Sequence, residues 1–444
     1  MKKTDWKAYC QGKYLLLDGA TGSNLMKAGM PFGVCPERWI LEHPDVLVNL
    51  QKAYIASGSH IIYAPTFTAN RIKLAEYGLQ DKQEEMIHGL VALSKEAAAG
   101  KALVAGDISM TGKQLEPIGD MSLEELIQVY KEQICFMEHA GVDLLIIETM
   151  MSLGETRAAL IAAKEVCDLP VLVTMTFEAN GKTLFGTDPQ TAAIVLESLG
   201  ADAIGVNCST GPADMAKIIR NMGEVVSIPL IAKPNAGLPV ASENGKTIYD
   251  MSPEIFAEEV QELIAAGAVI LGGCCGTDPE YIEKLHQLTD GQIPMSRNLK
   301  KNPEFYLTSE RKSYLFNMEK EPIIGQLINA SVNQELQEEL LSGSLDILAE
   351  LAADQEDDGA EILDINLDMD GICVKEMMLQ AIEELQMASS LPLSFHTAKP
   401  QVLEASLRHY PGHAMVYLPE ADEETCEQLK NIAQKYGAYI YNYK

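Results

Sequence analysis

The stretch SLEELIQVYKEQICFMEHAGVDLLIIETM, residues 122–150, contains one complete structural repeat of this chain. Its first part has the apolar spacing of an amphipathic helix and ends at Gly141, the residue type that most often closes a helix. Its second part, residues 144–150, is a short apolar run that finishes on Glu148, Thr149 and a methionine. A nearly continuous apolar run is typical of a strand that is buried on both faces of a parallel sheet.

Eight apolar runs of this kind occur between residue 13 and about residue 290, separated by longer amphipathic stretches. They are KYLLLDGAT, HIIYAPTFT, ALVAGDIS, LLIIETM, PVLVTMTF, AIGVNCS, PLIAKPN and AVILGGCC. Alternating strands and helices predict a parallel sheet, and eight such units predict a closed (β/α)₈ TIM barrel. An open, doubly wound sheet is the alternative fold, but no GxGxxG motif follows the first strand to support it.

A polar stretch, residues 293–320, follows the eighth unit and predicts a linker between a first domain at 1–292 and a second at 321–444. The alternation then resumes with the runs EPIIGQLIN, AEILDINL, PLSFHTA, HAMVYLP and YIYNYK. Five strands cannot close an eight-stranded barrel, so we expect a smaller, incomplete α/β domain with an open sheet. Because an open edge can pair with another chain, we expect a homodimer contact or packing against the first domain to cover it.

The composition excludes several classes of partner. A net charge of −30 argues against binding to nucleic acid or to an anionic membrane surface. The amino-terminal residues do not form a secretory signal, and no apolar stretch is long enough to cross a bilayer. The 9 cysteines lack the dense, even spacing of a secreted disulfide scaffold. These features predict a reduced, cytoplasmic protein whose notable cysteines bind a metal or react.

Polar or metal-ligating residues stand at the carboxyl ends of nearly all the predicted strands, where a (β/α)₈ barrel carries its active site. In chain order they are Asp18, Thr66, Asp107, Glu148, Thr176, Cys208, Asn235, and Cys274 with Cys275. A single polar residue in such a loop has little meaning, because these loops are polar in general. The collective pattern predicts a functional site at this end of the barrel.

Three of these residues, Cys208, Cys274 and Cys275, predict a metal site. Soft thiolates select zinc or an iron–sulfur cluster, and a cluster usually needs four cysteines. Three ligands and one open position describe a catalytic zinc site. A redox-active pair, or simple buried packing, is the alternative for the two adjacent cysteines.

The glycines around the adjacent cysteines support this interpretation. Consecutive residues on a regular strand point to opposite faces, so both thiols can reach one point only if the backbone bends. The flanking residues Gly272, Gly273 and Gly276 supply that freedom. The remaining cysteines are predicted to be packing or surface residues: Cys10, Cys35, Cys135, Cys167, Cys373 and Cys426.

A zinc ion with three thiolate ligands is better suited to alkyl transfer to sulfur than to hydrolysis. A thiol that enters the open position loses its proton to the metal and becomes a nucleophile at neutral pH. Activation of water is the common alternative, but three anionic sulfurs cancel much of the charge that this requires.

A thiol amino acid would also need partners for its ammonium and carboxylate groups. Asp18 and Glu148 are predicted to receive the ammonium, although Asp18 has the alternative role of a helix-capping or turn carboxylate. Backbone N–H groups of the DGATGS turn, including Gly19, are predicted to receive the carboxylate. Thr66 is a further predicted substrate contact, and Asn235 is predicted to fill the open zinc position when substrate is absent.

The motifs LLLDGATGSNL, GVNCS and GGCCGTDPE resemble those of the homocysteine S-methyltransferases. The likeness extends over about residues 10–290 and is closest to the homocysteine-binding module of cobalamin-dependent methionine synthase. It implies a (β/α)₈ barrel, a zinc ion on Cys208, Cys274 and Cys275, and homocysteine as the methyl acceptor. It also implies that Asp18 and Glu148 help to hold homocysteine.

The second part resembles the beginning of the pterin-binding barrel of the same synthase, through PIIGQLIN, ILDINL and PLSFHTAKPQVLEASLRHYPG. Three residues of the pattern are kept: Asn329, Asp364 and Asn366. Gln326 and Leu327 replace the usual Glu-Arg, and His396 stands where an aspartate is expected. These departures, and the shortness of the segment, argue against folate binding and against a complete cobalamin cycle on this chain.

The leading functional prediction is a zinc-dependent homocysteine S-methyltransferase that forms methionine. The barrel sequence leaves the methyl donor open: methylcobalamin on a separate corrinoid protein, S-methylmethionine or S-adenosylmethionine, or a betaine-type donor. The alternative is a non-catalytic zinc-binding scaffold that partners a corrinoid methyltransferase system.

Overall fold

The computed structural model describes residues 1–208, 210–241, 247–295, 297, 304–317 and 320–441. The chain forms two compact units, one comprising residues 1–185 and 201–299, the other residues 186–200 and 300–444. Of the predicted linker, residues 296, 298–303 and 318–319 lie outside the described residues, as do residues 442–444 of the last predicted strand. Among the helices that the structure describes, none has the length and hydropathy of a transmembrane segment.

The first unit is built on an eight-stranded parallel sheet in which each of the eight predicted runs supplies one strand. The strands are β1 (Leu15–Leu16), β2 (Ile61–Ala64), β3 (Leu103–Ile108), β4 (Leu144–Met150), β5 (Val171–Met175), β6 (Ala203–Asn207), β7 (Leu230–Lys233) and β10 (Ala268–Leu271). Their order is β1-β10-β7-β6-β5-β4-β3-β2, so neighbours in sequence are neighbours in the sheet. The predicted TIM-barrel class is confirmed.

The sheet closes between its first and last strands through His60. Its backbone N–H donates to the carbonyl oxygen of Leu16 at 2.7 Å, and its Nδ1 accepts from the N–H of the same residue at 2.9 Å. The imidazole ring of His60 therefore replaces a backbone carbonyl group as a hydrogen-bond acceptor between these two strands.

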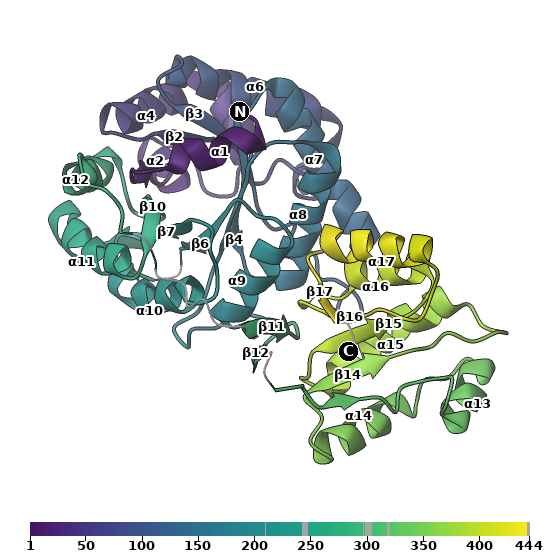
Figure 1. Ribbon diagram of the computed structural model, residues 1–444. Coiled ribbons are helices and arrows are strands. Elements are labelled where there is room, and N and C mark those ends of the chain that lie inside the picture. The colour runs from purple at the N-terminus through teal and green to yellow at the C-terminus, as the bar shows by residue number, and fades with distance from the viewer. Residues whose placement is uncertain (209, 242–246, 296, 298–303, 318–319, 442–444) are drawn as a thin grey trace. The chain divides into compact units, whose positions relative to one another are not determined.

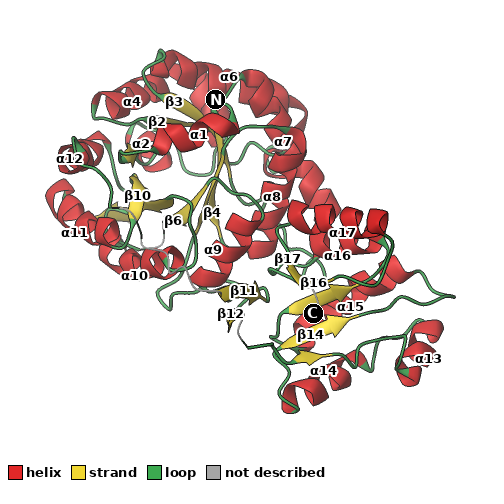
Figure 2. Ribbon diagram, in the orientation of Figure 1, coloured by secondary structure: helices red, strands yellow, loops and turns green. Residues whose placement is uncertain are grey.

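Helices surround the strands of this unit (Figures 1 and 2). They are α1 (Lys3–Cys10), α2 (Gly22–Lys27), α3 (Pro36–Glu42), α4 (Pro44–Ala56), α5 (Arg71–Ala75), the 3₁₀ turn η1 (Gln80–Lys82), α6 (Gln83–Ala98), α7 (Leu123–Ala140), α8 (Leu153–Val166), α10 (Pro212–Gly223), α11 (Pro253–Ala265) and α12 (Pro279–Thr289). The helix α7 shows why the sequence predicted them well. Ser122 and Glu125 form a capping box at its start, and Gly141 ends it in the left-handed conformation with φ +83°.

The interior of the barrel is apolar where the strands begin and polar where they end. Alternate residues of the strands form one buried cluster, with Leu144, Ile146 and Leu172 among them. Trp6 of α1 joins this cluster, and its Nε1 donates to the carbonyl oxygen of Asp202 at 3.1 Å, so α1 covers the end where the strands begin. By the two-residue period of a strand, inward positions further along carry Asp107, Glu148, Thr174, Asn207 and Lys233.

An antiparallel hairpin, β8 (Pro239–Ala241) and β9 (Thr247–Tyr249), follows β7. The strand prediction did not include it. Its last residue, Tyr249, packs near the cysteines described below.

The second unit contains a five-stranded parallel sheet in the order β13-β14-β15-β16-β17. Its strands are β13 (Ile324–Gly325), β14 (Ile362–Ile365), β15 (Leu393–His396), β16 (Met415–Tyr417) and β17 (Tyr439–Tyr441). Its helices are α9 (Pro189–Ser198), α13 (Gln334–Ser342), α14 (Leu348–Asp357), α15 (Val374–Ala388), α16 (Pro400–His409) and α17 (Glu423–Lys435). The predicted smaller, open α/β sheet is present.

Part of the predicted linker is a folded element. Its two strands, β11 (Glu304–Thr308) and β12 (Ser313–Asn317), form an antiparallel hairpin. Leu307 and Phe316 of the hairpin are buried against Ile362 and Met415 of the parallel sheet. The hairpin therefore covers one face of the five-stranded sheet near the beginnings of its strands. The alternation of apolar and polar residues in EFYLT and SYLFN is the signal for it.

Candidate functional site

The three predicted cysteines meet at the carboxyl end of the barrel. The Sγ atoms of Cys208, Cys274 and Cys275 all lie within 4.8 Å of one another. The sulfur of Cys208 is 2.7 Å from that of Cys274 and 3.8 Å from that of Cys275. Residues separated by 66 and 67 positions in the chain are thus brought to one point by the closure of the sheet.

The backbone leaves the regular strand conformation at each of these cysteines. Cys208 follows directly after β6 and has φ +61°, a left-handed conformation that costs a residue with a side chain roughly 1–2 kcal/mol. Cys274 and Cys275 come after β10, which ends at Leu271. Because both residues are outside the strand, the alternation of side chains no longer separates their thiols.

The glycines of GGCCGT are required mainly for space. A Cβ atom on Gly273 would collide with the side chain of Thr277, and one on Gly276 would collide with the ring of Tyr249. Gly276 also has φ +85°, so it is the glycine of this motif that supplies conformational freedom. The predicted importance of these glycines thus has two different physical causes.

Thr277 connects this turn to the DGATGS turn. Its Oγ1 donates to the carbonyl oxygen of Cys274 at 2.7 Å and accepts from the N–H of Ala20 at 3.2 Å. Gly19 lies against it, since a Cβ atom there would be 2.9 Å from Thr277 Oγ1 and 2.7 Å from the hydroxyl of Tyr54. The glycine turn is therefore packed against the cysteine segment.

The three thiols perturb one another's pKa values. Hydrogen bonds from Cys208 and Cys274 lower the pKa of Cys275 to about 3. The hydrogen bond from Cys274 lowers the pKa of Cys208, but the charge of Cys275 and burial outweigh it and raise that pKa to about 12. The same neighbours and burial raise the pKa of Cys274 well above its usual value. The pKa of Cys275 is therefore the lowest of the three thiols.

A buried lysine holds together the two carboxylates that were predicted to bind an ammonium group. Lys233 Nζ lies 3.3 Å from Glu148 Oε2 and 3.6 Å from Asp18 Oδ1, and 3.7 Å from the centre of the Tyr63 ring. All of these side chains are buried. Burial opposes the charge of Lys233, but Glu148, Tyr63 and Asp18 outweigh it and raise the pKa of its ammonium.

Burial disfavours the ionised form of carboxyl groups in this cluster. Burial raises the pKa of Asp18 to about 6, although Lys233 and a 2.8 Å hydrogen bond from the Tyr63 N–H act in the opposite direction. Burial and the charge of Glu148 raise the pKa of Asp107 well above its usual value. Perturbed carboxylates in a buried cluster are typical of functional sites.

Besides Asp18 Oδ1 and the Tyr63 hydroxyl of the group itself, two further polar atoms have no hydrogen-bond partner among the described residues: Asp107 Oδ1 and Asn235 Oδ1. Both residues are almost fully buried, at 5% and 4% exposure. Buried polar atoms are rarely left unpaired, so both atoms are candidates to contact a ligand. Thr66 is placed differently, because its hydroxyl donates to the carbonyl oxygen of Asp107 at 2.8 Å and accepts from the N–H of the same residue at 3.0 Å. Its predicted role toward substrate stays a prediction.

The sequence analysis missed Asn207, whose side chain forms hydrogen bonds beside the site. Its Oδ1 accepts from the N–H of Thr149 and the hydroxyl of Thr174, both at 2.8 Å. Its Nδ2 donates to Thr149 Oγ1 at 2.8 Å and lies 3.7 Å from Cys274 Sγ. Thr149 follows Glu148 at an irregularity of β4 and has φ +60°. One amide thus fixes the backbone beside a site carboxylate and contacts a site sulfur.

Lys233 was also missed. The signal for both residues is the two-residue period of their strands, which places a polar side chain inside the barrel after a run of apolar inward positions. A polar residue at such a position needs a partner or a function.

The donor set fits a zinc ion. Zinc–sulfur bonds of about 2.3 Å in a tetrahedral site place the sulfurs about 3.8 Å apart. The distance between Cys208 and Cys275 matches this value, at 3.8 Å, and the Cys208–Cys274 pair is closer, at 2.7 Å. Asn235 Oδ1 has no hydrogen-bond partner among the described residues, and its predicted place at the open zinc position stays a prediction.

The second unit has its own polar group at the carboxyl ends of its strands. The buried Asp364 accepts from Ser394 Oγ at 2.5 Å and lies 3.3 Å from Nδ1 of His396. His396 stands over the ring of Tyr417, with 4.3 Å between ring centres. A histidine at this position therefore has a structural partner in Asp364.

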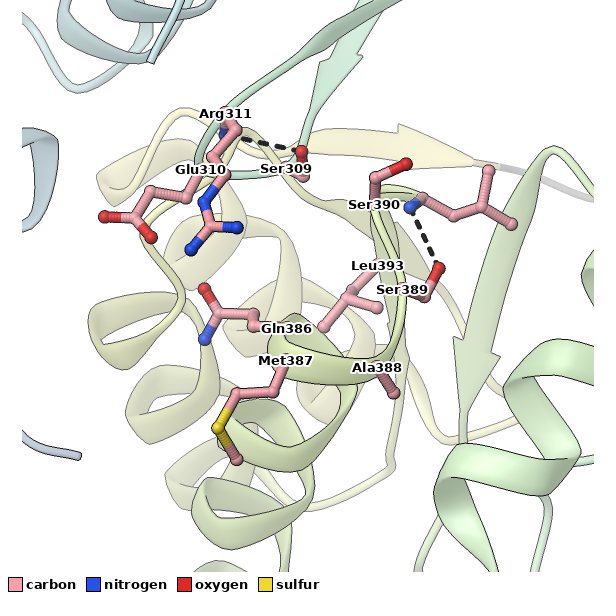
Figure 3. Close-up of a pocket in the computed structure, with 10 residues that line it drawn as sticks. Ser309, Glu310, Arg311, Gln386, Met387, Ala388, Ser389, Ser390 and Leu393 are labelled. Atoms are coloured by element: carbon pink, nitrogen blue, oxygen red, sulfur yellow. Dashed lines mark hydrogen bonds between the residues drawn. The ribbon is translucent and has the colours of Figure 1, made fainter. Parts of the chain in front are cut away.

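A separate depression, in the same unit, is shown in Figure 3. It is lined by Ser309, Glu310, Arg311, Gln386, Met387, Ala388, Ser389, Ser390, Leu391 and Leu393. The group includes no thiol or imidazole, so it offers none of the chemistry expected at the barrel site.

The fold and the site define an α/β barrel with a three-thiol centre at its carboxyl end. Residues 15–289 match the family described as homocysteine S-methyltransferase, so the chain belongs to that family. This membership confirms the predicted resemblance and the predicted class of enzyme, methyl transfer to a thiol.

Similar proteins agree with this assignment. The chain is 28% identical over 423 residues to the methionine synthase of Mycobacterium leprae and 27% identical over 432 residues to that of Mycobacterium tuberculosis. These alignments cover 90% and 93% of this chain but only 35% and 36% of the relatives, so the chain spans about a third of their length. Among solved structures, the metallated form of the homocysteine methyltransferase MmuM from Escherichia coli has a similar fold, with a TM-score of 0.54 and 22% identity. That match covers 63% of this chain and 98% of the other.

Proposed function

We propose that this chain transfers a methyl group to the thiol of homocysteine, forming methionine, at a zinc ion held by Cys208, Cys274 and Cys275. The observation that carries the proposal is the convergence of three thiols beside a buried group of carboxylates at the carboxyl end of the barrel. Zinc bound there would lower the pKa of a substrate thiol and so make it a nucleophile at neutral pH.

The residues of this chain perform the remaining tasks. The carboxyl groups of Asp18, Glu148 and Asp107 form a buried cluster of oxygen acceptors suited to the α-ammonium of an amino acid. Asn207 and Thr277 fix the turns that carry the site residues. In the reaction the sulfur forms a bond to the methyl carbon, the bond between that carbon and the donor breaks, and the thiol proton leaves to solvent.

We further propose that the donor is methylcobalamin on a separate corrinoid protein. The similarity to methionine synthases supports this donor, because it extends through the second unit and beyond the residues of the methyltransferase family. S-methylmethionine, S-adenosylmethionine and a betaine-type donor are the competing candidates.

The test is an assay of the purified protein with homocysteine and each donor in turn, with methionine as the product measured. Treatment with a chelator should abolish turnover, and added Zn²⁺ should restore it. Cys274→Ser should lose both the bound zinc and the activity, whereas Cys373→Ser, which changes an exposed cysteine, should retain both. Activity of Cys274→Ser with its metal intact would refute the proposal.

Calorimetric titration of the zinc-loaded protein with homocysteine separates this proposal from the alternative, a zinc-binding scaffold. A scaffold would hold zinc but would not bind homocysteine. The homodimer and the cytoplasmic location expected from the sequence are further proposals, which sedimentation and fractionation of cells would test.

A further inference from the structure

Tyr249 lies beside the three-thiol centre but has no part in the proposed function. It is the last residue of β9, in the hairpin that follows β7. Its ring packs against Gly276, where a Cβ atom would collide with it, and its hydroxyl forms a hydrogen bond with the side chain of Cys275. One aromatic side chain therefore contacts the cysteine turn through both its ring and its hydroxyl.

The backbone that follows Tyr249 is tied to the cysteine turn. The N–H of Met251 donates to the carbonyl oxygen of Ala236 at 3.3 Å, and the N–H of Ala236 donates to the carbonyl oxygen of Cys275 at 3.0 Å. The hydroxyl of Tyr281 also donates to the carbonyl oxygen of Met251. The segment that carries the Tyr249 hydroxyl is thus held in place relative to Cys275, as a preorganised contact requires.

In this contact the hydroxyl donates and the sulfur accepts. Burial, the charge of Cys275 and the hydrogen bond to its sulfur raise the pKa of the Tyr249 hydroxyl, so this group keeps its proton at neutral pH. The same hydrogen bond is among the effects that lower the pKa of Cys275. A neutral hydroxyl that donates to a thiolate withdraws part of the negative charge of the sulfur.

Withdrawal of charge from a ligand sulfur has a chemical consequence at a site with three thiolates. Three anionic sulfurs cancel much of the metal charge that acidifies an incoming thiol. A hydrogen bond to one of these sulfurs weakens its electron donation, so more of the metal's charge remains for the fourth ligand, the substrate sulfur. Hydrogen-bond partners of metal ligands commonly tune a metal in this way. The same hydrogen bond makes the ligand sulfur a weaker competitor for the methyl group.

We propose that Tyr249 is a positioning residue that acts through Cys275: in the metal-bound protein its hydroxyl donates to the Cys275 sulfur, weakens the electron donation of that sulfur and leaves more of the metal's charge for the substrate sulfur. This inference rests on the proposed function and extends it to a residue outside the thiols and the buried charged cluster. It predicts a change in the metal–sulfur bond itself, which a purely structural role of the ring would not produce.

The test loads the full-length protein with Co²⁺ in place of zinc and records the sulfur-to-cobalt charge-transfer absorption. A hydrogen bond to a ligand sulfur moves this absorption to shorter wavelength, because it stabilises the electrons of the sulfur. Tyr249→Phe keeps the ring against Gly276 but removes the hydroxyl, so its charge-transfer band should lie at longer wavelength than that of the wild type. Its affinity for zinc, measured by competition with a chelator, should fall by about tenfold.

Tyr77→Phe is the matched control, because Tyr77 is an exposed tyrosine of the same unit, and it should keep the wild-type band and zinc affinity. A Tyr249→Phe protein that binds cobalt with its band unmoved would overturn the proposal. If that variant does not bind cobalt, uniform replacement of tyrosine by 3-fluorotyrosine decides the matter. This stronger hydrogen-bond donor should move the band to shorter wavelength, and an unmoved band would overturn the proposal. Absence of a charge-transfer band from cobalt-treated wild-type protein would instead refute the thiolate metal site, and with it the proposed function.

Discussion

The most informative substitution outside the thiols and charged groups is Asn207→Leu. Leucine branches at Cγ as asparagine does, but it is bulkier and makes no hydrogen bond. Asn207 is fully buried and has three hydrogen bonds of 2.8 Å to Thr149 and Thr174. The substitution would leave a backbone N–H and two hydroxyl groups without these partners.

The expected loss of stability follows from these contacts. An unsatisfied buried polar group costs about 1–3 kcal/mol, and Thr149 is only partly buried while Thr174 is fully buried. We therefore expect the free energy of unfolding to fall by about 3–5 kcal/mol. For a domain of this size that is a decrease in Tm of roughly 6–12 °C. Because the amide also holds Thr149 at φ +60° beside Glu148 and contacts Cys274, affinities for zinc and homocysteine should fall by about tenfold or more.

Calorimetric scanning measures the change in Tm, and competition with a chromogenic chelator measures the affinity for zinc. Asn49→Leu, at an exposed position of α4, controls for the introduction of a leucine and should leave both values unchanged. A variant of Asn207 with wild-type Tm and wild-type zinc affinity would show that the amide does not organise the site.

Three further changes have distinct expected results. Asp18 has its pKa raised from 3.8 to about 6, so the folded state binds the proton more tightly and loses stability as the pH rises through this range. The free energy of unfolding of Asp18→Asn, measured in urea, should therefore rise relative to that of the wild type by on the order of 3 kcal/mol between pH 4 and pH 7. A difference between the two proteins that does not change with pH would contradict the raised pKa. In the metal-free protein the pKa of Cys275 is the lowest of the three site thiols, so iodoacetamide at pH 5 should alkylate Cys275 first, as peptide mass analysis would show. Preferential labelling of Cys208 would contradict this order of pKa values. Glu155 accepts three hydrogen bonds of 2.7–2.8 Å from Thr111 and Tyr130. Glu155→Leu should therefore lower the free energy of unfolding by about 3–5 kcal/mol but leave one zinc ion bound per chain. Loss of the zinc would show that Glu155 is coupled to the thiol site in a way that these contacts do not explain.

The sequence predicted those features that depend on local pattern. Apolar runs and helix-closing glycines such as Gly141 predicted the strands and helices of the barrel, because burial on both faces and closure of a helix each require particular residue types at short spacing. The same strands placed the three cysteines at one end, since parallel strands all end at the same edge. The alternation of apolar and polar residues in 304–317 also indicates the hairpin of the second unit, but the polar composition of the segment led to its prediction as a linker.

Only the tertiary structure decided which side chains are partners. Strand order predicts that Asp18 and Glu148 lie at the same end of the barrel, but not that Lys233 lies within 3.6 Å of both. It likewise does not reveal that Asn207 reaches Thr149 and Cys274. Electrostatic and hydrogen-bond energies depend steeply on distance and burial, and these are set by the closure of the sheet over residues far apart in the chain. The residue types at the strand ends therefore determined that a thiol and carboxylate site exists, and the folded barrel determined which charges remain available for a substrate.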